Sequence, residues 1–112
     1  MSEALDAEDA KLVTLARGAR GRIGAAQGAA VRDDMGRTYS GATVESGALT
    51  LSALQLAVAQ AVAAGARGIE CAVVCGSAGV DDDIAAVRDF TGAGIPVISV
   101  NADGSVRDRV MT

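Results

Sequence analysis

A nearly unbroken apolar run from Ile69 to Cys75 constrains the fold of this chain more than any other feature. A short continuous apolar run is expected of a strand that is buried on both faces. A helix is predicted over Asp81–Phe90, and a second strand over Val97–Asn101. Because a helical crossover joins these two strands, they should be parallel neighbours in one sheet.

The remaining segments add two helices and a hairpin before this unit. Helices are predicted from apolar spacing at Asp6 to about Ala26 and at Leu49–Ala64. Two short extended runs flank the turn at Asp33–Gly36, which indicates a β-hairpin. We therefore expect a single domain over residues 1–112, a layered α/β fold with a mixed central sheet. The segment Val106–Thr112 carries no clear assignment.

Composition excludes several classes of function. The chain has no His, which removes His-containing zinc sites and His-based acid–base catalysis. A formal net charge of −4 argues against nucleic-acid binding. The low-charge stretch Ser46–Ala66 contains polar residues and is expected to be a buried helix rather than a membrane span. No signal peptide is visible, so a soluble cytoplasmic protein without a membrane partner is expected.

The two cysteines are four residues apart on the Ile69–Cys75 strand. Their side chains should lie on one face, roughly 13 Å apart at about 3.3 Å per residue. A disulfide needs Cα atoms within about 7 Å of each other. We interpret Cys71 and Cys75 as small buried hydrophobic residues.

Four segments together resemble the cytidine deaminase family. Gly41–Ser46 (GATVES) and Leu49–Gln55 (LTLSALQ) are similar to the family's Gly-x-Asn-Val-Glu-Asn and Leu-Thr-Ile-Cys-Ala-Glu-Arg segments. Ala29–Tyr39 looks like the family's first hairpin, and Ile95–Gly104 looks like its late strand and turn. The resemblance covers nearly the whole chain and implies a cytidine deaminase-like fold, a three-layer α/β/α sandwich with a mixed central sheet.

The resemblance also implies that the catalytic residues of this family are missing. Such deaminases hold Zn²⁺ with three Cys ligands and move protons with a Glu. Ser52 and Val80 fall where two of the Cys ligands belong, Asp83 falls at the third, and Leu54 falls at the Glu. Since Val offers no ligand atom and Leu cannot transfer a proton, we expect neither zinc nor another cofactor.

The substrate-binding half of the motif is also reduced. Thr43 and Glu45 match the Asn and Glu that contact ribose in the family, so only the Glu is retained. The family's aromatic segment that holds the base corresponds to Gly24–Gln27, which has no aromatic residue. Thr43 and Glu45 remain the candidate ligand-binding residues.

Three functions stay open at this point. The preferred one is a deaminase homologue that has lost catalysis and acts as a structural or interaction protein, a homo-oligomer (dimer or tetramer) that covers the apolar Leu49–Ala64 helix. The second is a nucleoside-binding sensor that uses the remaining pocket. The third is a divergent hydrolase whose metal would be held by Ser52 and the carboxylates of Asp81, Asp82 and Asp83. Those three carboxylates also argue against a phosphate held by the backbone amides of the adjacent Gly76–Gly79 loop, because their charge lies where those amides would attract it.

Overall fold

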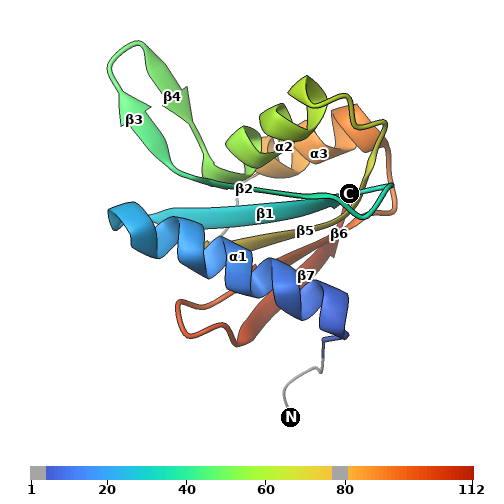
Figure 1. The fold of residues 1–112 in the computed structure, drawn as a ribbon, viewed down its shortest axis with the longest axis horizontal. Coiled ribbons are helices and arrows are strands. Elements are labelled where there is room, and N and C mark those ends of the chain that lie inside the picture. The colour runs from blue at the N-terminus through green and yellow to red at the C-terminus, as the bar shows by residue number, and fades with distance from the viewer. Residues whose placement is uncertain (1–4, 77–80) are drawn as a thin grey trace.

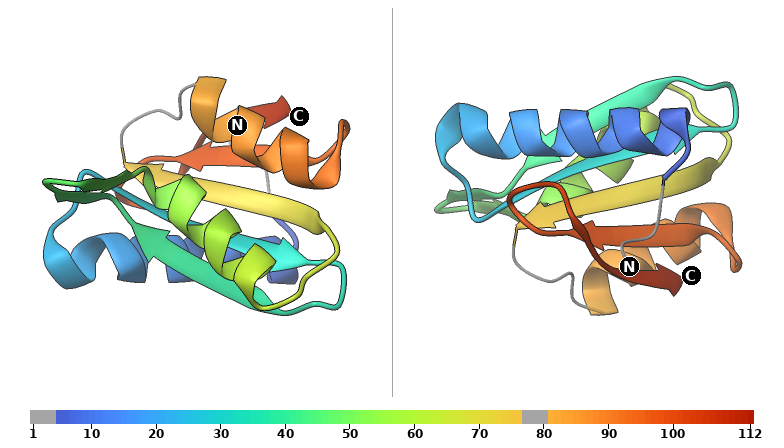
Figure 2. Two further views of the ribbon diagram at one scale, coloured as in Figure 1. Left: turned by 90° about the horizontal axis from the view of Figure 1, so that it is seen from above. Right: turned by 90° about the horizontal axis from the view of Figure 1, so that it is seen from below.

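A computed structural model describes residues 5–76 and 81–112, and Figure 1 shows their arrangement around one five-stranded sheet. The strand order is β2-β1-β5-β6-β7. Helix α1 covers one face of the sheet, and α2 and α3 cover the other (Figure 2). The predicted α/β/α sandwich with a mixed sheet is therefore confirmed. The elements are α1 (Ala7–Ile23), β1 (Gln27–Asp33), β2 (Thr38–Ala42), β3 (Val44–Ser46), β4 (Leu49–Leu51), α2 (Ala53–Ala63), β5 (Ile69–Gly76), α3 (Asp81–Thr91), β6 (Pro96–Val100) and β7 (Val106–Met111).

Strand β5 is central, as its sequence predicts. It pairs antiparallel with β1 and parallel with β6, so the crossover through α3 gives the expected parallel pair. Every residue from Cys71 to Cys75 is buried, and Glu70 is the exposed exception near the start of the strand. The strand thus supplies apolar side chains to both layers of helices.

The alternation along β5 divides the core into two clusters. Cys71, Val73 and Cys75 pack in the cluster beneath α1, together with Leu12 and Ala16 of that helix. Ala72 and Val74 belong to the second cluster, which includes buried residues of α2 and α3. Both cysteines are free and buried, as the sequence predicts. None of the helices in the described ranges is long and apolar enough to cross a bilayer.

The prediction that the second helix starts at Leu49 is wrong. Residues 49–51 form β4, which pairs antiparallel with β3, and α2 begins only at Ala53. Gly47 has a φ of 62°, a value that favours glycine and lets the chain turn between these strands. Leu49 and Leu51 also fit the apolar spacing of the helix that follows, but they belong to the β3–β4 hairpin. The helix starts after them because Ser52 is its N-cap.

Two other boundaries differ from the sequence prediction. Helix α1 ends at Ile23 rather than near Ala26, because Gly24 adopts the left-handed conformation that closes the helix. Strand β7 occupies the unassigned C-terminal segment and pairs antiparallel with β6 along the sheet edge. Three of the six residues of this exposed edge strand are charged, so the apolar alternation that marks a buried strand is absent from its sequence.

The β1–β2 turn is held by Asp33, a carboxylate with no solvent exposure. Its Oδ1 accepts the backbone N–H groups of Met35 (2.9 Å) and Arg37 (2.8 Å). Its Oδ2 accepts the Arg37 guanidinium (2.8 Å) and the Tyr39 hydroxyl (3.0 Å). Burial alone would raise the pKa of Asp33, but these hydrogen bonds to the charged form lower it below its usual range.

We expect Asp33 to make stability depend on pH in the acid range. Because its pKa is lower in the folded state, its contribution is complete above the unfolded pKa, about 3.9, and is lost as pH falls through the folded pKa. Asp33→Asn should therefore reduce the free energy of unfolding at pH 7 and have a smaller effect at low pH. Urea denaturation from pH 7 to pH 2 measures this difference, with Asp34→Asn at the exposed neighbour as the control. An equal loss at every pH would contradict the role of the charge.

Candidate functional site

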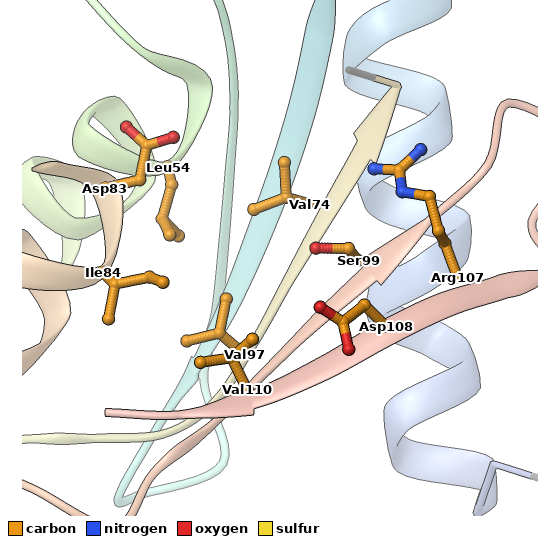
Figure 3. Close-up of a pocket in the computed structure, with 9 residues that line it drawn as sticks. All are labelled: Leu54, Val74, Asp83, Ile84, Val97, Ser99, Arg107, Asp108 and Val110. Carbon is orange, nitrogen blue, oxygen red and sulfur yellow. The ribbon is translucent and has the colours of Figure 1, made fainter. Parts of the chain in front are cut away.

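A small cavity lies between the sheet and the starts of α2 and α3. Its volume is about 80 Å³, well below the roughly 300–1,000 Å³ of ordinary ligand pockets. Figure 3 shows the side chains around it: apolar groups from α2, α3 and the sheet, the Asp83 carboxylate from α3, and further polar groups from β6 and β7. The lining residues are Leu54, Val74, Asp83, Ile84, Val97, Ser99, Arg107, Asp108 and Val110.

Helix α2 reaches this position because it packs closely on β2. A Cβ added at Gly41 would lie 3.0 Å from Cγ of Leu56 and 3.1 Å from the carbonyl oxygen of Ala53. A side chain at that point of β2 would have to push Leu56 and the first turn of the helix outward, so glycine favours the present depth of the helix. The first turn then directs Leu54 into the cavity, where its side chain is completely buried.

Ser52 serves as the N-cap of α2. Its Oγ accepts the backbone N–H of Gln55 (3.1 Å), and the Gln55 Oε1 accepts the backbone N–H of Ser52 (3.0 Å). This reciprocal pair is a capping box, which satisfies backbone donors that a helix start leaves exposed. The hydroxyl of Ser52 is therefore engaged in holding the helix.

The structure brings together two of the four positions that the resemblance assigned to metal and catalysis. Leu54 and Asp83 line the same cavity, and Asp83 in the first turn of α3 is only 2% exposed. Ser52 lies at the start of the same helix as Leu54 but is used for capping. Val80 lies outside the described residues, as do the side chains of Asp81 and Asp82.

The described residues around this cavity do not fit a zinc ion. Leu54 has no donor atom, and the carboxylates on the lining are Asp83 and Asp108. No group of three or more His, Cys, Asp or Glu side chains that could hold a metal occurs in the part of the chain that the structure describes. Structural and catalytic zinc sites use three or four such ligands, with His and Cys preferred.

The cysteines lie on the opposite side of the sheet from this cavity. They pack beneath α1, whereas Val74 between them points toward the cavity. Burial raises the pKa of the Cys71 thiol to about 12, so it stays protonated at neutral pH and is a poor metal ligand. This agrees with the sequence interpretation of both residues as core hydrophobics.

A second, open hollow collects the residues predicted to meet a nucleoside. It has a volume of about 310 Å³ and is lined by residues 23–26 together with Thr43 and Glu45. The Thr43 Oγ1 accepts the backbone N–H of Gln27 (3.1 Å) and donates to its carbonyl oxygen (3.4 Å). Glu45 is exposed. The structure therefore places these segments side by side, but it leaves the Thr43 hydroxyl bound to the backbone.

Sequence reasoning missed the polar lining from the last two strands. Ser99 on β6 and the pair Arg107 and Asp108 on β7 border the first cavity. The available signal was the spacing of Val106 and Val110 with charged residues between them, which fits a partly covered strand. The bulge at Arg107 then separates their faces: Val106 packs beneath α1, whereas Asp108 and Val110 line the cavity.

The chain matches known proteins over most of its length. The cytidine deaminase-like family model matches residues 5–104. The cytidine deaminase from Burkholderia pseudomallei superposes with a TM-score of 0.77 at 24% identity, covering 91% of this chain and 89% of that one. For the Mycobacterium leprae enzyme the TM-score is 0.72 at 16% identity, covering 91% and 93%. For the Mycobacterium tuberculosis enzyme it is 0.71 at 20% identity, covering 84% and 85%. These similarities show the fold, and no curated protein matches the chain.

We expect Ser52→Ala to reduce stability by about 0.5–2 kcal/mol, the range typical of a lost N-cap. The free energy of unfolding in urea measures this change. Ser46→Ala on the exposed β3 strand is the matched control and should have little effect. An unchanged unfolding midpoint for Ser52→Ala would show that the capping box is unimportant.

Proposed function

The chain belongs to the cytidine deaminase-like family, and on that basis we propose that it is a member without catalytic activity that serves as a structural or interaction protein. The observation that carries this proposal is Leu54. Its buried side chain stands where the resemblance requires the proton-transferring Glu, and it lines the small cavity at the starts of α2 and α3. General acid–base catalysis contributes about 10²–10⁴ in rate, and Leu can supply none of it.

The chemistry around Leu54 supports the same conclusion. Ser52 is committed to the capping box, so its hydroxyl stabilises α2 instead of holding a metal. Burying apolar side chains where a polar cleft would otherwise need solvent or ligand stabilises the fold. Thr43 is bound to Gln27, which leaves Glu45 as the remaining candidate contact to a nucleoside. This supports weak or absent nucleoside binding, and calorimetry with cytidine tests it directly.

We expect the purified protein to carry no stoichiometric zinc and to leave cytidine unchanged. Metal analysis by mass spectrometry and an ultraviolet assay of cytidine loss measure these two quantities. Cytidine turnover that a chelator abolishes would overturn the proposal.

A gain-of-metal variant provides the positive control for this experiment. The combination of Ser52→Cys, Val80→Cys and Asp83→Cys places thiols at the positions that the resemblance assigns to ligands. We expect this variant to bind zinc stoichiometrically, whereas Ser52→Cys alone should not. If the combined variant folds and takes up no zinc, the assignment of these positions is wrong.

The outer face of α2 supports assembly with further copies of this chain. The helix contains no charged residue, and Ala59, Val62 and Ala63 on it are exposed. Figure 1 shows the β3–β4 hairpin projecting beyond α2, and Leu49 on it is 53% exposed. A solvent-facing helix normally carries charges, and a lone two-stranded ribbon is only marginally stable in water. A homodimer or tetramer would cover both, in the cytoplasm that the sequence favours.

We expect charged substitutions on this face to dissociate the assembly. Leu49→Glu and Val62→Glu should each shift the mass in solution toward that of the 11.1 kDa chain, because a charge would be buried in an apolar contact. Light scattering after gel filtration measures the mass. Met35→Glu is the control, since Met35 is 75% exposed but lies in the β1–β2 turn. A wild-type protein that is monomeric at all concentrations would contradict the assembly.

A further inference from the structure

Three arginines gather near the carboxyl end of β5, and each donates a hydrogen bond to a backbone carbonyl. Arg107 Nη1 lies 2.8 Å from the Gly76 oxygen, Arg17 Nε lies 3.1 Å from the Ala102 oxygen, and Arg20 Nε lies 3.4 Å from the Ala26 oxygen. In the described ranges none of the three forms an ion pair with a carboxylate. This cluster is not part of the deaminase-like motif.

Two other arginines of the chain are paired with carboxylates. Arg32 forms ion pairs with Asp9 (3.0 Å) and Glu70 (2.6 Å). Arg37 forms one with the buried Asp33 (2.8 Å). In a chain with a net charge of −4, carboxylates are available for structural cations. The cluster at the end of β5 therefore stands out because its contacts are to neutral carbonyl groups.

Close packing of α1 on the sheet holds Arg20 in place. A Cβ at Gly28 would lie 2.0 Å from the carbonyl oxygen of Ala16 and 2.7 Å from the backbone N of Arg20, so only glycine permits this approach. Gly76 has a φ of 106°, and a Cβ there would lie 3.0 Å from Nε of Arg20. The Arg20 side chain consequently passes directly over the end of β5.

A β-bulge directs Arg107 to the same point. The register pairs Ser99 with Asp108 and Val100 with Val106, which leaves Arg107 as the extra residue of β7. Bulges redirect side chains in this way and are common beside functional sites. Figure 3 shows the Arg107 guanidinium beside the end of β5, with α1 behind it. Asn101 Oδ1, 3.2 Å from Nη1, fixes the side chain further.

Two guanidinium groups thus lie beside the same residue: Arg107 donates to the carbonyl oxygen of Gly76, and Nε of Arg20 would lie 3.0 Å from a Cβ on it. Like charges held close together repel each other, and an anion between them removes that repulsion. Each guanidinium has five N–H donors, and the carbonyl contacts use only some of them. Planar guanidinium groups match the oxygens of phosphate, which carries about two negative charges at neutral pH.

We propose that Arg20 and Arg107, with Arg17 beside them, form a binding site for the phosphate group of a small phosphorylated molecule. The site uses no zinc ligand and no residue of the Thr43 hollow, so it can be present whether or not the chain has lost catalysis. Arg107 also borders the cavity that Leu54 and Asp83 line. Gly28 and Gly76 allow the close approach of Arg20, and the bulge in β7 directs Arg107, so these three features build the site.

The test is a titration of the ¹⁵N-labelled full chain with pyrophosphate and inorganic phosphate, followed by nuclear magnetic resonance. We expect saturable shifts centred on Gly76, Asn101 and the side-chain Nε–H signals of Arg20 and Arg107. Arg20→Ala and Arg107→Ala should each weaken pyrophosphate binding at least tenfold, since each removes one of the two charged forks (about 1.4 kcal/mol per tenfold change). Arg107→Lys, which keeps the charge but not the fork, should give an intermediate affinity.

Arg22→Ala is the matched control, because Arg22 is an exposed arginine in the last turn of α1. It should leave pyrophosphate binding unchanged. Equal weakening by Arg22→Ala, or equal shifts with sodium chloride at the same ionic strength, would reduce the effect to general electrostatics and overturn the proposal. If Arg107→Ala fails to fold, the wild-type shifts and the affinity of Arg107→Lys still test the role of Arg107. The absence of saturable shifts in the wild-type protein refutes the site.

Discussion

Burial of β5 on both faces is the constraint on which the rest of the structure depends. Its side chains alternate between the cluster beneath α1 and the cluster beneath α2 and α3. With one Tyr, one Phe and no Trp in the chain, the core is built from small aliphatic residues, and these need close helix–sheet contact to exclude water. Glycines provide that contact at Gly28 under α1 and at Gly41 under α2, where an added Cβ would meet backbone or side-chain atoms.

The same close packing determines what the deaminase-like positions can do. Helix α2 is deep enough for Leu54 to be fully buried, and its start is fixed by the Ser52–Gln55 capping box. Ser52, which stands where the resemblance places a zinc ligand, therefore stabilises the start of the helix instead. Asp83 is the one position of the four that keeps a charged ligand atom in the described part of the structure, and a single carboxylate does not make a zinc site.

Four arginines of the chain fall into two pairs that differ in the charge of their hydrogen-bond partners. Arg32 pairs with carboxylates of α1 and β5 and so connects both elements to β1. Arg37 pairs with Asp33 and so stabilises the β1–β2 turn. Arg107 donates to the carbonyl oxygen of Gly76 and Arg20 to that of Ala26, and these bonds use only some of the five N–H donors of each guanidinium, which is the arrangement that an external anion requires. The charge total of the chain does not reveal this local concentration.

The sequence by itself determined the α/β/α order, the central position of Ile69–Cys75 and the burial of both cysteines, because apolar periodicity reports burial directly. It also identified Leu54 and Asp83 as related positions, through the resemblance. It did not identify β4, the start of α2 at Ala53 or the edge strand β7, since short exposed strands depend on pairing with segments distant in sequence. Only the tertiary structure brought Arg20 and Arg107 close to one residue, Gly76. The bulge in β7 and the close packing of α1 on the sheet cause this, and both are properties of packing between elements. Neither leaves a periodic signal in the sequence.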